Sequence, residues 1–133
     1  MAAAGFEEVS RDIVPDEREL IAERLIALCD GGDVDLVLTT GGTGLGPRDV
    51  TPEATRQVID LEVPGMAEAM RMETLKNTPF AMLSRSVAGV RNGCLIVNLP
   101  GSPNGVRETL EVALKGLPHA LEMVKGWRTH PGA

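Results

Sequence analysis

The sequence is poor in aromatic residues and in positive charge. Three aromatic side chains, Phe6, Phe80 and Trp127, occur among 133 residues, and there is no tyrosine. Asp and Glu number 19 against 13 Lys and Arg, so the formal net charge at pH 7 is −6. Nucleic-acid sites need clustered positive charge, and single-strand binders also need aromatic rings on which bases stack. We therefore expect neither nucleic acid nor an acidic membrane surface as a partner.

Long hydrophobic runs and the marks of secretion are also missing. No apolar run approaches the roughly 20 residues of a membrane-spanning helix, and the N-terminus lacks the basic region and apolar core of a signal peptide. Cys29 and Cys94 lie in apolar segments, which favours buried thiols over a disulfide or a metal pair. His119 and His130 belong to no metal-ligand or triad spacing. These absences predict no membrane contact and a cytoplasmic location.

What is present is enough apolar material for one compact domain. The hydrophobic fraction is 43%, and a chain of this length can bury a real core. We expect a single domain over residues 1–133, with a core of Val, Leu, Ile, Ala and Met. Residues 127–133 read as a loose tail.

Strand and helix patterns alternate along the chain. The all-apolar run Leu36–Leu38 is typical of a strand covered on both faces, and Asn92-Gly93 is a strong hairpin signal between two strands. The expected elements are a strand over 7–14, a helix capped by Asp16 that stops at Gly31-Gly32, a helix with Thr51 as N-cap and Pro52 in its first turn, a helix from Pro64 to about Lys76, strands over 82–90 and 94–99, and a helix capped by Ser102. This alternation predicts an α/β fold, a three-layer αβα domain around a mostly parallel sheet.

The stretch from Thr39 to Glu53 carries the strongest functional signal. It reads Thr-Thr-Gly-Gly-Thr-Gly-Leu-Gly-Pro-Arg-Asp-Val-Thr-Pro-Glu. A glycine-rich turn between a strand and a helix exposes backbone N–H groups to a ligand, and the start of the helix favours an anion. The stretch therefore predicts a phosphate site. Its candidate residues are Thr40, Gly41, Gly42, Thr43, Gly44, Arg48 and Asp49.

A second tight turn, formed by Pro100, Gly101, Ser102 and Pro103, follows the strand expected at 94–99 and precedes a helix. The carboxyl ends of parallel strands meet at one edge of a sheet, and ligands bind in the crevice beyond that edge. We therefore expect the two turns to open onto the same edge and to share one pocket.

Plainer interpretations remain open for each of these residues. The loop lacks the Gly-Lys-Ser/Thr ending of a Walker A sequence, and Pro47 stands where the dinucleotide pattern has its third glycine, so the glycines could serve only the backbone turn. Asp49 could be an ordinary turn residue, and Asp16 and Ser102 could only cap helices. Charged side chains that could contact phosphate or only add solubility are Arg71, Lys76, Arg85 and Arg91.

Four motifs, in this order, resemble the MoaB/Mog family of molybdenum cofactor biosynthesis proteins. They are Thr39–Gly44, Arg48–Glu53, Pro64-Gly65 with Glu68 and Arg71, and Asn98–Pro103. The resemblance extends from about Gly5 to Gly126, which is nearly the whole chain.

The resemblance implies a molybdopterin adenylyltransferase, which transfers AMP from Mg-ATP to the terminal phosphate of molybdopterin and releases pyrophosphate. It implies Mg²⁺ as the cofactor, molybdopterin and ATP as the ligands, and a homotrimer or hexamer as the assembly. By position, Asp49 matches the family's catalytic aspartate and Asp16 its second functional acid. The glycine loop and the Pro100–Ser102 turn resemble its substrate-binding loops.

The chain also departs from the family pattern. Family members begin with a strand and a Ser-Asp loop ahead of the position of Phe6, whereas residues 1–5 resemble only the last turn of the helix that follows, with Gly5 as its C-terminal cap. We expect a natural start upstream of Met1.

The alternative function is a non-catalytic molybdopterin-binding or scaffold trimer. A third interpretation is a nucleotide-sugar or NADP-type binder with its ribose-binding acid at Asp60 or Glu62.

Overall fold

The computed structural model describes residues 5–126. The predictions that fall on residues 1–4 and 127–133, a helix turn and a loose tail, lie outside the described residues. The elements in chain order are α1 (Arg18–Asp30), β1 (Leu36–Thr40), α2 (Thr51–Val58), β2 (Leu61–Glu62), α3 (Pro64–Leu75), the 3₁₀ helix η2 (Pro79–Leu83), β3 (Ala88–Arg91), β4 (Cys94–Leu99), α4 (Pro103–Leu114) and α5 (Leu117–Val124).

The four strands form one mixed sheet in the order β1-β4-β3-β2. β1 and β4 run parallel, with Val37 beside Ile96, whereas β3 is antiparallel to both β4 and β2. In the described chain the sheet is therefore mixed, not mostly parallel as the alternation of patterns predicted. The cause is the hairpin at Asn92-Gly93, where φ values of 47° and 77° reverse the chain between β3 and β4.

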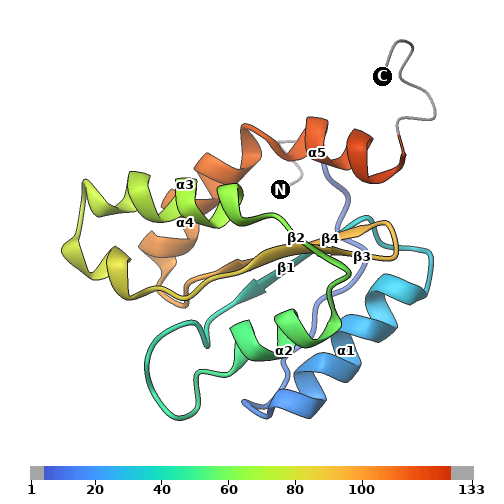
Figure 1. Cartoon of the computed structure of the whole chain (residues 1–133), viewed down its shortest axis with the longest axis horizontal. Coiled ribbons are helices and arrows are strands. Elements are labelled where there is room, and N and C mark those ends of the chain that lie inside the picture. The colour runs from blue at the N-terminus through green and yellow to red at the C-terminus, as the bar shows by residue number, and fades with distance from the viewer. Residues whose placement is uncertain (1–4, 127–133) are drawn as a thin grey trace.

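Helices cover both faces of this sheet, as Figure 1 shows. α1 and α2 pack on one face, where Leu25 and Val58 share a buried cluster with Ile96. α3, α4 and α5 pack on the other face, where Met70 and Val97 belong to a second buried cluster. Successive residues of β4 point to opposite cores, and all six are buried. The three-layer αβα prediction is confirmed.

Several element boundaries differ from the predictions. Residues 7–14 form no strand, and Val9 and Ile13 are exposed, because no neighbouring strand pairs with this segment. Asp16 does not cap α1, whose N-cap position is Glu17 without a side-chain hydrogen bond. Thr51 is not the N-cap of α2 but its first helical residue, and the N-cap position is Val50.

The strand predicted over 82–90 is shorter at its beginning. Pro79 starts the 3₁₀ helix η2, and Thr78 caps it by accepting a hydrogen bond from Phe80 N at 3.3 Å. Strand pairing begins only at Ala88. Ser102 caps α4 as predicted, because its side chain accepts from Gly105 N at 3.0 Å.

Cys29 and Cys94 are free, buried thiols, as predicted. A hydrogen bond with Cys29 and burial both raise the pKa of the Cys94 thiol. Among residues 5–126, no helix has both the length and the apolar character required to cross a membrane.

Candidate functional site

The glycine loop joins β1 to α2 and meets the second turn at the carboxyl end of the parallel strands (Figure 1). Gly41 N donates a hydrogen bond to Leu99 O at 3.0 Å. A Cβ added at Gly101 would lie 3.4 Å from Gly41 Cα, so the two turns touch backbone to backbone. The prediction that both turns open onto one edge of the sheet is confirmed.

The loop folds back on the start of α2. Thr51 N donates to Gly42 O at 3.2 Å. Gly42 has a φ of +70°, and a Cβ there would lie only 2.3 Å from Thr51 Oγ1. Glycine is therefore required at this position by both backbone angle and space.

Successive backbone N–H groups at the start of the loop remain available to a ligand. Gly41 N–H is not among them, because it already donates to Leu99 O. Within the described chain, the N–H groups of Gly42, Thr43 and Gly44 donate to no protein acceptor. Successive unpaired N–H groups in a glycine-rich turn form an anion-binding concavity.

Asp49 sits over the second half of the loop. Its Oδ2 accepts a hydrogen bond from Gly46 N at 2.8 Å, and its own N donates to Gly46 O at 3.0 Å. A Cβ at Gly44 or Gly46 would stand 3.0 or 2.9 Å from Oδ2. The two glycines thus make room for a half-buried carboxylate at the rim of the cradle.

Arg85 holds the loop from behind. Its guanidinium donates to Gly44 O at 2.8 Å and to Asp49 O at 2.6 Å. It also forms an ion pair with Glu53 at 2.5 Å. This hydrogen-bonded pairing lowers the pKa of Glu53 and raises the pKa of Arg85. Sequence reasoning left Arg85 among the possible phosphate contacts, and no sequence pattern indicated these partners.

Asn98, fully buried in β4, ties three segments together beneath the loop. Its Oδ1 accepts from Val87 N at 3.1 Å. Its Nδ2 donates to Thr39 Oγ1 at 2.9 Å and to Thr55 Oγ1 at 3.1 Å. The signal in the sequence is a single amide side chain inside an otherwise apolar strand, which sequence reasoning noted only as part of a motif.

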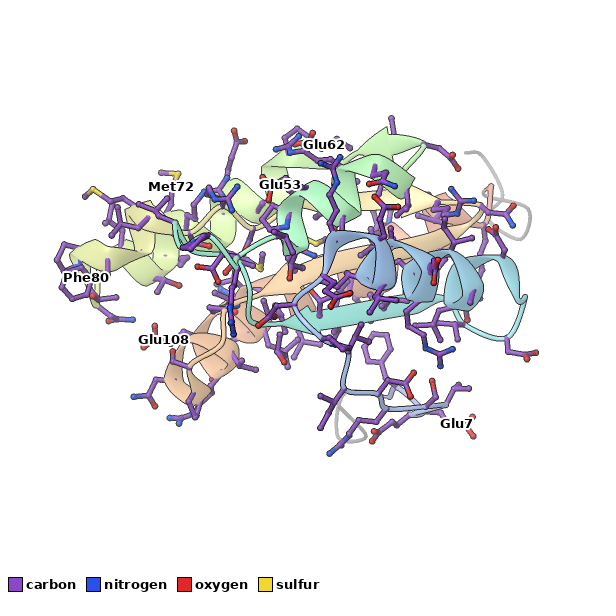
Figure 2. All side chains as sticks on the ribbon, turned by 90° about the horizontal axis from the view of Figure 1, so that it is seen from below. Glu7, Glu53, Glu62, Met72, Phe80 and Glu108 are labelled. Carbon is purple, nitrogen blue, oxygen red and sulfur yellow. The ribbon has the colours of Figure 1, made fainter. Side chains whose placement is uncertain are left out.

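A pocket of about 350 Å³ opens beside the second turn, between α3, η2 and α4. The turn contributes Pro100 and Ser102 to its wall, whereas no residue of the glycine loop lines it, so this is not the shared pocket that the sequence predicted. Figure 2 shows Phe80 and Glu108, which line this pocket, at the same end of the molecule. Other lining residues are Met70, Arg71, Asn77 and Asn104.

Thr74 of α3 also lines the pocket and carries an unsatisfied hydroxyl. The residue is 7% exposed, and within residues 5–126 its Oγ1 has no hydrogen-bond partner. Buried polar atoms are almost always paired, so this hydroxyl is suited to a polar atom of a ligand. Sequence reasoning missed Thr74 because one threonine on a helix gives no signal.

The remaining predicted residues occupy varied positions. Thr43 is buried, whereas Thr40 and Arg48 are exposed. Asp16 is exposed ahead of α1, and the hydrogen bonds that build the loop do not include it. Arg18 Nε donates to Gln57 of α2 at 2.9 Å, so the start of α1 reaches the helix that follows the loop.

The other charged candidates have protein partners. Lys76 pairs with Glu73, and Arg91 pairs with Asp30. Arg71 donates to Ser86 O at 3.0 Å and lines the pocket.

The donor set at the cradle fits a magnesium ion that arrives with a phosphate-bearing ligand. Mg²⁺ is commonly held by one or two carboxylates together with substrate phosphates. Among the described residues, no group of three or more His, Cys, Asp or Glu could hold a metal ion. Asp49, with one oxygen bound to Gly46 N, is the carboxylate at the cradle that matches this requirement.

The fold and the site together define a three-layer αβα domain with a glycine loop of unpaired backbone amides at one sheet edge. Residues 1–119 match the family described as a probable molybdopterin binding domain. The molybdopterin adenylyltransferase of Helicobacter pylori strain J99 is 50% identical over 119 residues, covering 90% of this chain and 68% of that protein. The molybdopterin adenylyltransferase of Escherichia coli K12 is 42% identical over 131 residues, covering 90% of this chain and 67% of that protein.

Solved structures agree with these relatives. The molybdopterin biosynthesis enzyme MoaB of Thermus thermophilus superimposes with a TM-score of 0.85 at 57% identity, covering 91% of this chain and 76% of that one. A structure of MogA superimposes with a TM-score of 0.87 at 44% identity, covering 92% of this chain and 80% of that one. The chain belongs to the molybdopterin-binding domain family of molybdenum cofactor biosynthesis proteins, which confirms the resemblance seen in the sequence. It spans about two thirds of the length of the curated relatives.

Proposed function

We propose that the chain is a molybdopterin adenylyltransferase that transfers AMP from Mg-ATP to the terminal phosphate of molybdopterin. The observation that carries this proposal is the contact between the two turns at the sheet edge, where Gly41 N meets Leu99 O at 3.0 Å beside the rim carboxylate of Asp49. The activity named for relatives 42–50% identical to the chain supports it.

The glycine loop binds the phosphates of ATP in this proposal. The N–H groups of Gly42, Thr43 and Gly44 supply donors without adding positive charge, and the first turn of α2 adds the favourable end of a helix dipole. Such donors suit an acidic protein that must hold a strongly anionic ligand. Arg48, exposed next to Asp49, adds positive charge at the entrance.

The pocket beside the second turn binds the pterin. Phe80 offers apolar surface to a flat ring, and the carboxylate of Glu108 lines the same space. A pterin presents adjacent N–H and NH₂ donors, which a carboxylate accepts as a pair. The buried hydroxyl of Thr74 can complete the set of polar contacts.

The transfer itself needs little covalent chemistry from the protein. An oxygen of the terminal molybdopterin phosphate attacks the α-phosphorus of ATP and forms a new P–O bond. The bond from that phosphorus to the bridging oxygen breaks, and pyrophosphate leaves with the electron pair. Catalysis of such a step is mostly positioning and electrostatic stabilisation. When bound, Mg²⁺ supplies neutralising charge on the phosphates.

Asp49 carries the main catalytic role in this proposal, and Asp16 a supporting one. The half-buried carboxylate of Asp49, fixed by Gly46 N–H, would hold Mg²⁺ together with the phosphates, and the ion would supply charge neutralisation there. Asp16 lies on the segment that leads into α1, whose start reaches α2 through Arg18 and Gln57.

The test incubates purified protein with molybdopterin, ATP and Mg²⁺ and measures adenylylated molybdopterin and pyrophosphate. We expect turnover, and we expect Asp49→Asn to lower kcat by at least about a hundredfold, as for lost electrostatic stabilisation. Asp33→Asn is the control and should keep the wild-type rate. Asp33 is an exposed carboxylate that precedes the first residue of β1, whereas the glycine loop follows its last residue. Tight molybdopterin binding without any product would instead support the scaffold alternative.

A homotrimer and a cytoplasmic location also belong to the proposal. The observation that supports assembly is a group of exposed apolar side chains on α3 and η2, namely Met72, Leu75, Phe80, Met82 and Leu83. Exposed apolar residues that gather on one surface typically mark contacts between proteins.

A further inference from the structure

Arg85 commits every nitrogen of its guanidinium group to the glycine loop and the helix behind it. Nε donates to Gly44 O at 2.8 Å, and Nη2 donates to Asp49 O at 2.6 Å. Nη1 donates to Glu53 Oε2 at 2.5 Å. The backbone N of Arg85 donates to Thr43 O at 2.8 Å. One residue thus holds the loop at three carbonyls.

We propose that Arg85 is a positioning residue that fixes the glycine loop, and through it the carboxylate of Asp49, for adenylyl transfer. The inference rests on the proposed function. Because each of its three guanidinium nitrogens already donates to the loop or to Glu53, Arg85 acts by holding the loop.

The direction of the free N–H groups follows from these contacts. In a trans peptide unit the C=O and the following N–H point in opposite directions. When Arg85 N holds Thr43 O, the N–H of Gly44 is turned away from Arg85. In the same way Thr51 N holds Gly42 O, which turns away the N–H of Thr43. The backbone N of Arg85 therefore fixes the direction of the Gly44 donor, while its guanidinium group fixes the adjoining peptide units at Gly44 O and Asp49 O.

Glu53 anchors the clamp to α2. Its carboxylate pairs with Arg85, and the two side chains are 40% and 35% exposed. The hydrogen bond from Arg85 lowers the pKa of Glu53, so the pair stays ionised at neutral pH. Both the loop and the first turn of α2 are thereby held by the same guanidinium group.

A matched arginine stands at the opposite end of β3. Arg91 donates to both carboxylate oxygens of Asp30, at 3.2 and 3.0 Å, and to Val58 O at 2.7 Å. It thus bridges a carboxylate and a backbone carbonyl as Arg85 does, but it touches no residue of the glycine loop. Arg91→Lys is therefore the control for the purely structural effect of losing such a bridge.

The experiment measures AMP transfer from Mg-ATP to molybdopterin by the wild type, Arg85→Lys and Arg91→Lys. Lysine keeps the charge, but one nitrogen cannot reproduce the planar fork. We expect Arg85→Lys to lower kcat by at least about tenfold, as a misplaced reacting group does, with a smaller change in the KM for ATP. Arg91→Lys should keep the wild-type kcat. Equal kcat values for the two variants would overturn the inference.

Two further measurements separate positioning from stability and from the proposed function. If Arg85 acts through Asp49, adding Arg85→Lys to Asp49→Asn should lower kcat by no more than about twofold, because coupled residues are non-additive. Multiplicative losses would contradict this. Amide hydrogen exchange at Gly46 and Asp49, whose N–H groups are hydrogen-bonded within the loop, should be at least about tenfold faster in Arg85→Lys than in Arg91→Lys. Faster exchange in Arg85→Lys is expected even if the wild type transfers no AMP. Absence of AMP transfer by the wild type overturns only the proposed function. Unchanged exchange overturns the proposal that Arg85 holds the loop.

Discussion

Gly42 is the most constrained residue of the glycine loop. It has a positive φ, and an added Cβ would lie 2.3 Å from Thr51 Oγ1. The threonine belongs to the first turn of α2 and is buried, so it has little room to yield.

We predict that Gly42→Ala displaces the loop and costs about 1–3 kcal/mol of stability, in the range of other strained backbone substitutions. The affinity for Mg-ATP, measured by calorimetry, should fall at least about tenfold, since the free N–H groups on either side of the strained peptide move. Gly65→Ala is the control, because a Cβ there meets nothing within 4 Å. Wild-type affinity in Gly42→Ala would show that the loop does not hold the nucleotide.

Asn98 contributes to stability through three hydrogen bonds in a fully buried position. We predict that Asn98→Ala lowers the free energy of unfolding by about 2–4 kcal/mol, because Val87 N and two threonine hydroxyls lose a buried partner. Urea denaturation measures the change. Asn98→Asp keeps an acceptor for Val87 N and has a donor for the threonine hydroxyls only when its carboxyl is protonated, so its loss of stability should be intermediate only at such acidic pH. A change in Asn98→Ala below about 0.5 kcal/mol contradicts this account.

At the scale of the elements, the clamp between Arg85 and α2 makes stability depend on acid pH. Glu53 has a pKa lowered from its ordinary value of 4.5. A carboxylate of this kind contributes stability that is fully present above its unfolded-state pKa and is lost as the pH falls through its lower folded-state pKa. The window of this loss therefore lies below about pH 4.5.

We predict that the wild type loses melting temperature more steeply below pH 4.5 than Glu53→Gln does. The variant cannot change its charge at this position, so the corresponding part of the acid dependence disappears. Thermal unfolding followed between pH 3 and 6 measures both slopes. Glu23→Gln, an exposed change on α1, should retain the wild-type slope. Identical slopes for wild type and Glu53→Gln would mean that the ion pair contributes nothing to the fold.

Local signals in the sequence predicted several elements and the shared sheet edge. The apolar run of β4, the Asn92-Gly93 hairpin and the Ser102 cap depend on neighbouring residues only, and each was confirmed. The strand expected over 7–14 was wrong, because a strand exists only where another strand pairs with it.

The parts of the site that sequence reasoning missed depend on distant partners. Arg85 lies 41 residues from Gly44 along the chain, and Asn98 lies 43 from Thr55. An isolated arginine or asparagine gives no periodic or spacing signal. The hydroxyl of Thr74 lacks a hydrogen-bond partner because of how the folded chain packs around it, and the sequence alone does not show this. The catalytic roles of Asp49 and Asp16 stay predictions.

At the scale of the whole molecule, the exposed apolar side chains of α3 and η2 support the proposed homotrimer. Met72 is 69% exposed and Phe80 74% exposed, and Figure 2 shows both toward the same end of the molecule. Single exposed apolar residues are common, but a group of them on adjoining elements points to a contact between subunits.

We predict that light scattering gives a mass of three times the 14.1 kDa chain, and that Met72→Glu together with Met82→Glu yields monomers, because a charge in an apolar contact is costly to bury. Leu61→Glu, at an exposed position of β2, is the control and should leave the mass unchanged. A monomeric wild type contradicts the homotrimer.

Binding of the ATP phosphates by the free loop amides can be followed directly through the amide chemical shifts of ¹⁵N-labelled protein during titration with Mg-ATP. We expect the largest and saturable shifts at Gly42, Thr43 and Gly44, and no change at the amides beside Arg91, at the far end of β3. Saturable binding that leaves these three amides unperturbed would contradict this expectation.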